Sequence, residues 1–383
     1  AVEAVEGMTT VSEGGRVILA AGDYPDEFEI KNKSVQILGR CASMVRLTGT
    51  AAKMTGSSWK VITVTGPAGL ALRDLTIDSN LLGVWVRLGQ SASGVYQGAS
   101  FVAERVVFRG NAGSAALIEG IGSEALLRQC HVDTTRKLPP DFNNGKEAGF
   151  GVQVRYGAEV TIERSLIDET YSVGLFVEDP MTEVTLRDSV ISRSGLKASQ
   201  IKEEAHVNFE GVSLLDSGLI ALQFTEGATA TMVDSLVRRV TPFPMGSEGG
   251  TFAVGIGLDL ASRLTLKRSV LADPGGYAIE VFQEGSHLDA EDVLMTRLFG
   301  LDTALNGAGG LGLNSGANAN IKGVAIIGHE LAAIRVRRSE LNADQLFVSG
   351  AEDRNKGDAY PAIGMWVYGG DEDNLGRVTL SES

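Results

Sequence analysis

Short segments in which apolar and polar residues alternate recur along the chain at nearly regular intervals. Residues 161–170 read TIERSLIDET and residues 185–194 read TLRDSVISRS, and both contain an apolar residue, two charged residues and a small residue in that order. Alternation with a period of two predicts β-strands, and helical i, i+3, i+4 spacing is nearly absent after the first dozen residues. The pattern therefore predicts an all-β chain.

The small or apolar fourth position of this frame marks a repeat of about 23 residues that is sometimes longer. About ten residues after most markers comes a second strand signal, two apolar residues flanking one free position, as in GLFV at 174–177. One unit cannot bury its apolar side chains alone, but stacked units cover one another. The markers are Leu75, Val106, Cys130, Ser165, Ser189, Val212, Ser235, Ser269, Val293, Val324 and Leu346.

Charge inverts between equivalent positions of neighbouring repeats, as from Glu163 to Arg187. In a stack of parallel strands such positions lie about 4.8 Å apart, so opposite charges attract and like charges repel. Signs alternate, with one apolar break, along a first column of Arg73, Glu104, Arg128, Glu163, Arg187, Glu210, Val233, Lys267, Glu291, Lys322 and Asp344. They also alternate over the first five members of a second column, Arg87, Glu119, Arg155, Glu178, Lys202, Thr225 and Asp259. Two such columns predict a parallel β-helix with in-register coils, about twelve of them.

These coil frames resemble the right-handed parallel β-helix superfamily with the pectin-lyase-like fold. The opening GGRVILAAGDYPDEFEIKNKSVQILGR at 14–40 is similar to the first coil of many secreted bacterial members. The resemblance implies one continuous right-handed β-helix domain over residues 1–383, with its N-terminal coil at about 1–47. It implies no single activity, because the superfamily holds lyases, hydrolases, esterases, adhesins and tail spikes.

Composition limits the kinds of partner, membrane segment and metal site that are expected for this chain. The net charge of −14 argues against nucleic acid, and without a run of 18 apolar residues we expect no membrane span. Cys130 falls in the small-residue column, so we expect it to pack inward, unpaired with Cys41 several coils away. The four histidines are scattered, so no zinc site is expected, and no cofactor is predicted. No Asp-rich calcium loop appears in the sequence, and bound calcium stays open.

The two ends of the sequence suggest export and a longer protein. The chain begins at Ala1 without an initiator methionine, which fits a secreted, extracellular or cell-envelope location. GRVTLSES at 376–383 repeats the frame of EVTLRDS, so we expect the sequence to stop inside a coil. The piece is therefore expected to belong to a longer chain, and association into a homo-oligomer stays open.

Insertions lengthen the link between the marker and the following strand at four places, residues 136–149, 241–254, 299–310 and 351–362. They should rise along one edge of the helix, where loops carry function, with a further insertion at 89–100 in the other turn. Three uninterrupted coils between the first two insertions predict a trough. The residues expected to bind a ligand there are Phe176, Gln200, Gln223, Arg155 and Asp179. An aromatic ring with amides and charges suits a sugar chain.

Two functions fit this trough. Glu178 with Glu203 or Glu226 on adjacent coils could form the carboxylate pair of a glycoside hydrolase, and Lys202 could be the base of a polysaccharide lyase. The polygalacturonase Asp-Asp and Gly-His-Gly motifs and the pectate-lyase Arg-x-Pro-x-x-Arg segment are absent. Glu178 and Lys202 also belong to the charge columns, where surface pairing is the ordinary role. We therefore favour a non-enzymatic extracellular or cell-surface module that binds a polysaccharide or cell-surface glycan, or serves as a structural or adhesive rod.

Overall fold

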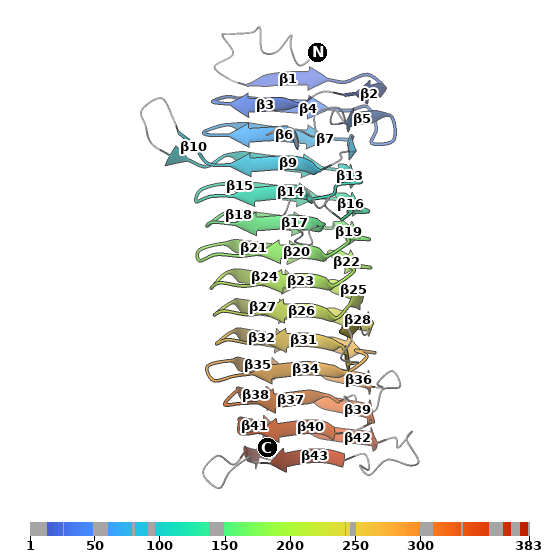
Figure 1. Cartoon of the computed structure of the whole chain (residues 1–383), viewed down its shortest axis with the longest axis vertical. Helices are drawn as coiled ribbons and strands as arrows, with labels where there is room; N and C mark the ends of the chain where they lie inside the picture. The colour runs from blue at the N-terminus through green and yellow to red at the C-terminus, as the bar shows by residue number, and fades with distance from the viewer. Residues whose placement is uncertain are drawn as a thin grey trace. The chain divides into compact units, whose positions relative to one another are not determined.

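The computed structural model describes residues 14–25, 27–48, 60–78, 81–90, 96–137, 149–241, 243–245, 250–298, 309–330, 332–351, 363–368 and 376–381. They fall into two compact units, residues 1–190 and 191–383, and the strand β22 (Val190–Ser192) contains the division. Within each unit the chain visits three parallel sheets in turn, here called sheets A, B and C, and then returns to sheet A (Figure 1). Each unit is therefore a parallel β-helix, as the repeat predicts, and it is right-handed, as the resemblance implies. The single continuous domain over 1–383 stays a prediction.

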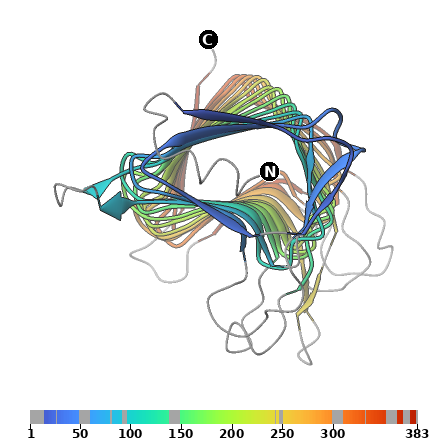
Figure 2. The ribbon, with the colours of Figure 1, turned by 90° about the horizontal axis from the view of Figure 1, so that it is seen from above.

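In the first unit each coil contributes one strand to each sheet, and the strands enclose the core (blue to green in Figure 2). Sheet A contains β1 (Gly15–Ile18), β4 (Ser34–Leu38), β7 (Gly69–Arg73), β12 (Ser100–Glu104), β15 (Glu124–Arg128), β18 (Glu159–Glu163) and β21 (Glu183–Arg187). Sheet B contains β2 (Gly22–Tyr24), β5 (Val45–Thr48), β8 (Thr76–Asp78), β13 (Val107–Arg109), β16 (His131–Asp133) and β19 (Leu166–Asp168). Sheet C contains β3 (Phe28–Lys31), β6 (Lys60–Thr65), β9 (Leu82–Arg87), β14 (Ser114–Glu119), β17 (Phe150–Arg155) and β20 (Val173–Val177).

The second unit repeats this arrangement. Sheet A contains β24 (His206–Glu210), β27 (Thr229–Val233), β32 (Arg263–Lys267), β35 (His287–Glu291), β38 (Asn318–Lys322), β41 (Glu340–Asp344) and β44 (Arg377–Ser381). Sheet B contains β25 (Ser213–Gly218), β28 (Leu236–Thr241), β33 (Val270–Ala272), β36 (Leu294–Leu298), β39 (Ala325–His329) and β42 (Phe347–Ala351). Sheet C contains β23 (Lys197–Ile201), β26 (Ile220–Phe224), β31 (Val254–Leu258), β34 (Tyr277–Phe282), β37 (Leu311–Asn314), β40 (Ala332–Arg337) and β43 (Ile363–Tyr368).

Apolar residues of the frame form the core of each unit. Ile162, Leu186, Phe209 and Leu266 open their frames, and each is at most 1% exposed. Their inward orientation follows from the strand period of two, which sends alternate side chains to opposite faces of the sheet. The predicted register is therefore confirmed at these positions.

The turn from sheet A to sheet B explains why the marker is so often small. The residue before the marker has a positive φ in coil after coil, for example 47° at Arg164 and 47° at Asp188. The Ser165 hydroxyl then donates to the Glu163 carbonyl at 2.8 Å and accepts the Cys130 N–H at 3.0 Å. Serine at this position satisfies backbone groups that the turn leaves unpaired. Cys130 packs inward as expected, and both cysteines are free thiols.

The first charge column is confirmed within each unit. Glu104 lies in register with Arg73 and Arg128, and Glu163 with Arg128 and Arg187. The Glu163 carboxylate is 3.0 Å from the Arg128 guanidinium and 3.8 Å from that of Arg187. In the second unit the column runs in register through Glu210, Val233, Lys267, Glu291, Lys322 and Asp344. Opposite charges therefore do meet on neighbouring coils.

Hairpins occupy two of the predicted insertions. Strands β10 (Gly89–Gln90) and β11 (Tyr96–Gln97) pair antiparallel and project from the first unit in Figure 2. Strands β29 (Phe243–Met245) and β30 (Gly250–Phe252) pair antiparallel in the second unit. Most of the insertions at 136–149, 299–310 and 351–362 lies outside the described residues. Within the described part of the chain, no helix is long and apolar enough to cross a membrane.

Candidate functional site

The predicted trough combines residues from both units. Phe176 lies on β20 of the first unit, whereas Gln200 and Gln223 lie on β23 and β26 of the second. The loop 138–148, one of its two expected walls, is outside the described residues. The trough as a whole therefore stays a prediction, and its residues are considered unit by unit.

On the outer face of sheet C in the first unit, one row of side chains runs through Trp85, Leu117, Gln153 and Phe176. The ring of Phe176 packs against Phe150, with centroids 5.0 Å apart and an angle of 37° between the planes. Such a tilted pair is a favourable aromatic geometry. Phe176 is thus part of an aromatic pair beside an amide, with a tryptophan three strands away. We use the name sheet C surface of the first unit for this row with Phe150 and for the charged row beside it. The charged row consists of Arg87, Glu119, Arg155 and Glu178.

A charged row flanks these side chains in register and holds the tryptophan in place. The Glu119 carboxylate accepts a hydrogen bond from the Arg155 guanidinium at 2.9 Å and one from Trp85 Nε1 at 2.8 Å. Arg155 also lies 3.7 Å from the Glu178 carboxylate, and the Lys60 ammonium lies 3.5 Å from the centre of the Trp85 ring. Burial lowers the pKa of Lys60. Arg155 therefore forms ion pairs with both Glu119 and Glu178 at the surface. The alternation of charge in the second column is confirmed from Arg87 to Glu178.

The remaining predicted residues occupy turns that follow sheet C. The Asp179 carboxylate accepts the backbone N–H of Tyr156 at 3.2 Å, so this side chain supports the neighbouring turn. The Lys202 ammonium contacts the Glu203 carboxylate at 2.5 Å, and Glu226 has a φ of 58°. Glu178 belongs to a different unit from the two glutamates proposed as its catalytic partners, so that carboxylate pair stays a prediction.

The outer row of sheet C in the second unit begins as an amide pair. The Gln200 amide donates to the Gln223 carbonyl at 3.2 Å. The row continues in register through Gly257, Glu280, Gly312, Arg335 and Trp366. Two glycines thus flank an acidic residue on an outward-facing row.

Glu280 is a buried acid that sequence reasoning missed. It is 4% exposed, and its carboxylate bonds the Arg335 guanidinium at 2.8 Å across the intervening Gly312. The Arg335 guanidinium also lies 4.5 Å from the centre of the Tyr277 ring. Burial raises the pKa of Glu280 to about 7, although Arg335 opposes this shift. The signal available in the sequence was an acid, a glycine and an arginine at the same position of three successive coils.

Among the described residues, no group of three or more His, Cys, Asp or Glu side chains could hold a metal ion. No cofactor is inferred from these side chains.

Comparison with known proteins places the fold. No protein-family model and no curated protein matches the sequence. The catalytic unit of a GH87 α-1,3-glucanase from Streptomyces thermodiastaticus strain HF3-3 is similar in structure, with a TM-score of 0.54 and 12% identity over 96% of this chain. This chain spans 63% of that catalytic unit. PfbA, a surface adhesin of Streptococcus pneumoniae, has a TM-score of 0.52 and 12% identity over 93% of this chain and 92% of its own.

At these identities the similarity shows the fold alone. With the three parallel sheets of each unit, it places the chain in the class of right-handed parallel β-helix proteins with the pectin-lyase-like fold. Because this fold carries many unrelated functions, the function has to be argued from side chains.

Proposed function

We propose that this chain is an extracellular or cell-surface β-helix module that binds a glycan on the sheet C surface of the first unit and leaves the glycan chemically unchanged. The observation that carries the proposal is the packed pair Phe150–Phe176 next to Gln153. An aromatic face offers the apolar contact that sugar rings need, and an amide offers both a donor and an acceptor for their hydroxyls.

The charged row supports binding rather than catalysis. Glu119 and Glu178 both contact Arg155, and Glu119 also accepts the Trp85 N–H. A glycosidase needs one carboxyl group as an acid and a second as a base or nucleophile. Here the same arginine engages both carboxylates, and Trp85 is fixed before any ligand arrives. A surface whose side chains are held in place before binding loses little conformational entropy when a ligand binds, and this favours affinity.

The location and the partner are parts of the same proposal. PfbA is described as a surface adhesin and the glucanase as acting on a glucan, but a shared fold does not transfer either property. A polysaccharide lyase or glycoside hydrolase is the alternative, and it predicts a product. Incubation with a panel of polysaccharides should therefore yield neither new reducing ends nor unsaturated ends, and either product would overturn the non-catalytic part of the proposal.

The binding test removes the aromatic pair. Phe176→Ala should weaken glycan binding about five- to thirtyfold, which corresponds to about 1–2 kcal/mol for the contact of one ring. Trp366→Ala is the matched control, because Trp366 faces outward on sheet C of the second unit. Circular dichroism should show that both variants keep the native fold. Equal loss of binding in both variants, or in neither, would show that the sheet C surface is ordinary protein surface.

A further inference from the structure

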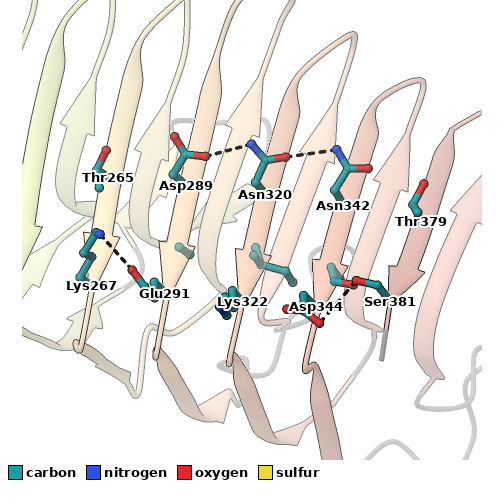
Figure 3. Close-up of a pocket in the computed structure, with 13 residues that line it drawn as sticks. Thr265, Lys267, Asp289, Glu291, Asn320, Lys322, Asn342, Asp344, Thr379 and Ser381 are labelled. Atoms are coloured by element: carbon teal, nitrogen blue, oxygen red, sulfur yellow. Dashed lines mark hydrogen bonds and ion pairs between the residues drawn. The ribbon is translucent and has the colours of Figure 1, made fainter. Parts of the chain in front are cut away.

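A groove of about 510 Å³ crosses the outer face of sheet A in the second unit, from β32 to β44 (Figure 3). Its walls are two parallel rows of side chains, two residues apart along each strand. The first row is Thr265, Asp289, Asn320, Asn342 and Thr379, and the second row is Lys267, Glu291, Lys322, Asp344 and Ser381. We call this feature the sheet A groove. It lies on a different sheet from every residue predicted to bind a ligand.

Hydrogen bonds between coils orient the first row. The Asn320 amide donates to the Asp289 carboxylate at 2.9 Å, and the Asn342 amide donates to the Asn320 carbonyl at 3.1 Å. His287 Nε2 lies 2.9 Å from the same Asp289 oxygen. Each side-chain amide has two N–H groups and an oxygen with two lone pairs, so Asn342 keeps hydrogen-bonding capacity for a ligand. This wall is a prearranged ladder of polar groups (Figure 3).

The second row is nearly balanced in charge. The Lys267 ammonium pairs with the Glu291 carboxylate at 2.9 Å, and the Ser381 hydroxyl lies 3.4 Å from Asp344. Among the described residues, Lys322 makes no ion pair. The ten side chains of the two rows thus include two cations and three anions, so the groove offers no concentration of positive charge for an acidic chain.

The strands beneath the middle of the groove offer little to an extended peptide. Each floor strand, β35, β38 and β41, is paired in register on both sides. An extended peptide usually binds by adding to an unpaired strand edge or by filling apolar pockets. Beneath β35, β38 and β41 the groove has no open edge, and the ten side chains of its two rows are polar or charged. Among the described residues, β44 is the last strand of sheet A, so only its outer edge is unpaired.

We propose that the sheet A groove binds a neutral oligosaccharide that lies along the stack of coils, at a site separate from the sheet C surface of the first unit. Successive polar groups of each wall lie about 4.8 Å apart, a spacing comparable to the advance of one sugar ring along an extended chain. Five strands give a length of about 19 Å, which suits a ligand of a few sugar residues. Hydroxyl, amide and carboxylate groups are the partners that sugar hydroxyls require.

The test uses the intact chain and neutral gluco-, manno- and xylo-oligosaccharides of four to six residues, with binding measured by isothermal titration calorimetry. Asn320→Ala and Asn342→Ala should each weaken binding about five- to tenfold, the effect of losing one or two hydrogen bonds. Asn208→Ala is the matched control, because Asn208 lies in the same row on β24 but outside the groove. Phe176→Ala should leave this affinity unchanged, which separates the groove from the proposed site on the first unit.

A second variant distinguishes a loss of binding from a loss of the native fold. Thr265→Val keeps the shape of the wall and removes one hydroxyl, and it should also weaken binding while the thermal unfolding curve stays native. Equal affinities of the Asn320, Asn342 and Asn208 variants would overturn the proposal, as would failure of every neutral oligosaccharide to bind. If uronate oligosaccharides or extended peptides bind instead, and Lys322→Gln abolishes that binding, the ligand of the groove belongs to another class. The proposal of a neutral saccharide would then be wrong.

Discussion

The buried pair Glu280–Arg335 predicts a component of stability that depends on pH. Burial raises the pKa of Glu280 to about 7 from its usual value of 4.5, so between these values the folded chain binds more protons at this residue than the unfolded chain does. The free energy of unfolding then falls as the pH rises. The contribution is fully present below about pH 4.5 and is lost as the pH rises through about 7. Glu280→Gln removes the titrating group and should remove this dependence.

The expected magnitude follows from the two pKa values. Their difference corresponds to about 3 kcal/mol, because one pKa unit is about 1.4 kcal/mol. The side chain of Glu280 is only 5% exposed, so solvent screens this effect little. Other carboxyl groups titrate in the same range, and the informative quantity is therefore the difference between the wild-type chain and Glu280→Gln.

Urea unfolding at several pH values from about 3 to 8 measures that difference. Relative to Glu280→Gln, the wild-type chain should lose about 3 kcal/mol of stability across this range. Glu291→Gln is the control of opposite sign, because contact with Lys267 lowers the pKa of Glu291. The contribution of Glu291 is present above its usual pKa and is lost at lower pH. Parallel curves for the wild-type chain and Glu280→Gln would refute the reasoning.

Three further substitutions test the core, the charge column and the glycine between coils. Leu186→Ala should lower the free energy of unfolding by about 2–5 kcal/mol in urea unfolding, because Leu186 is fully buried, and a loss below 1 kcal/mol would contradict its inward orientation. Arg187→Glu would face Glu163 and should cost about 1 kcal/mol in low salt and less in high salt, so an unchanged melting temperature in low salt would count against in-register stacking. Gly312→Val would place its Cβ 3.3 Å from the Glu280 carboxylate and should lower the free energy of unfolding by about 1–3 kcal/mol. A melting temperature equal to that of the wild-type chain would show that Glu280 and Arg335 move aside without cost.

Much of the fold follows from the sequence because it depends on position within the repeat. Alternation along each frame decides which side chains face inward, and Ile162 and Leu186 are buried as predicted. Charge signs in the columns reveal register, since Glu163 can meet both Arg128 and Arg187 only if the coils stack in phase. Neither inference needs knowledge of the loops.

The candidate sites could be predicted only in part. The frame showed that Phe176 faces outward, but its partner Phe150 follows a long insertion, and its alignment with the stack is not visible in the repeat. A third charge column was not predicted from the sequence. It lies one residue before the marker, where Arg105 pairs with Asp74 at 2.6 Å and Arg268 with Asp234 at 2.8 Å.

The repeated frame in the sequence by itself determined the parallel β-helix, its inward residues and its alternating charges, because each depends on the position of a residue within one coil. Only the tertiary structure decided the burial of Glu280 and the existence of the sheet A groove. Glu280 and Arg335 are 55 residues apart and meet because Gly312 leaves room between them. Burial and hollows depend on the sizes of side chains in several successive coils at once, and a period read along one chain does not contain that information.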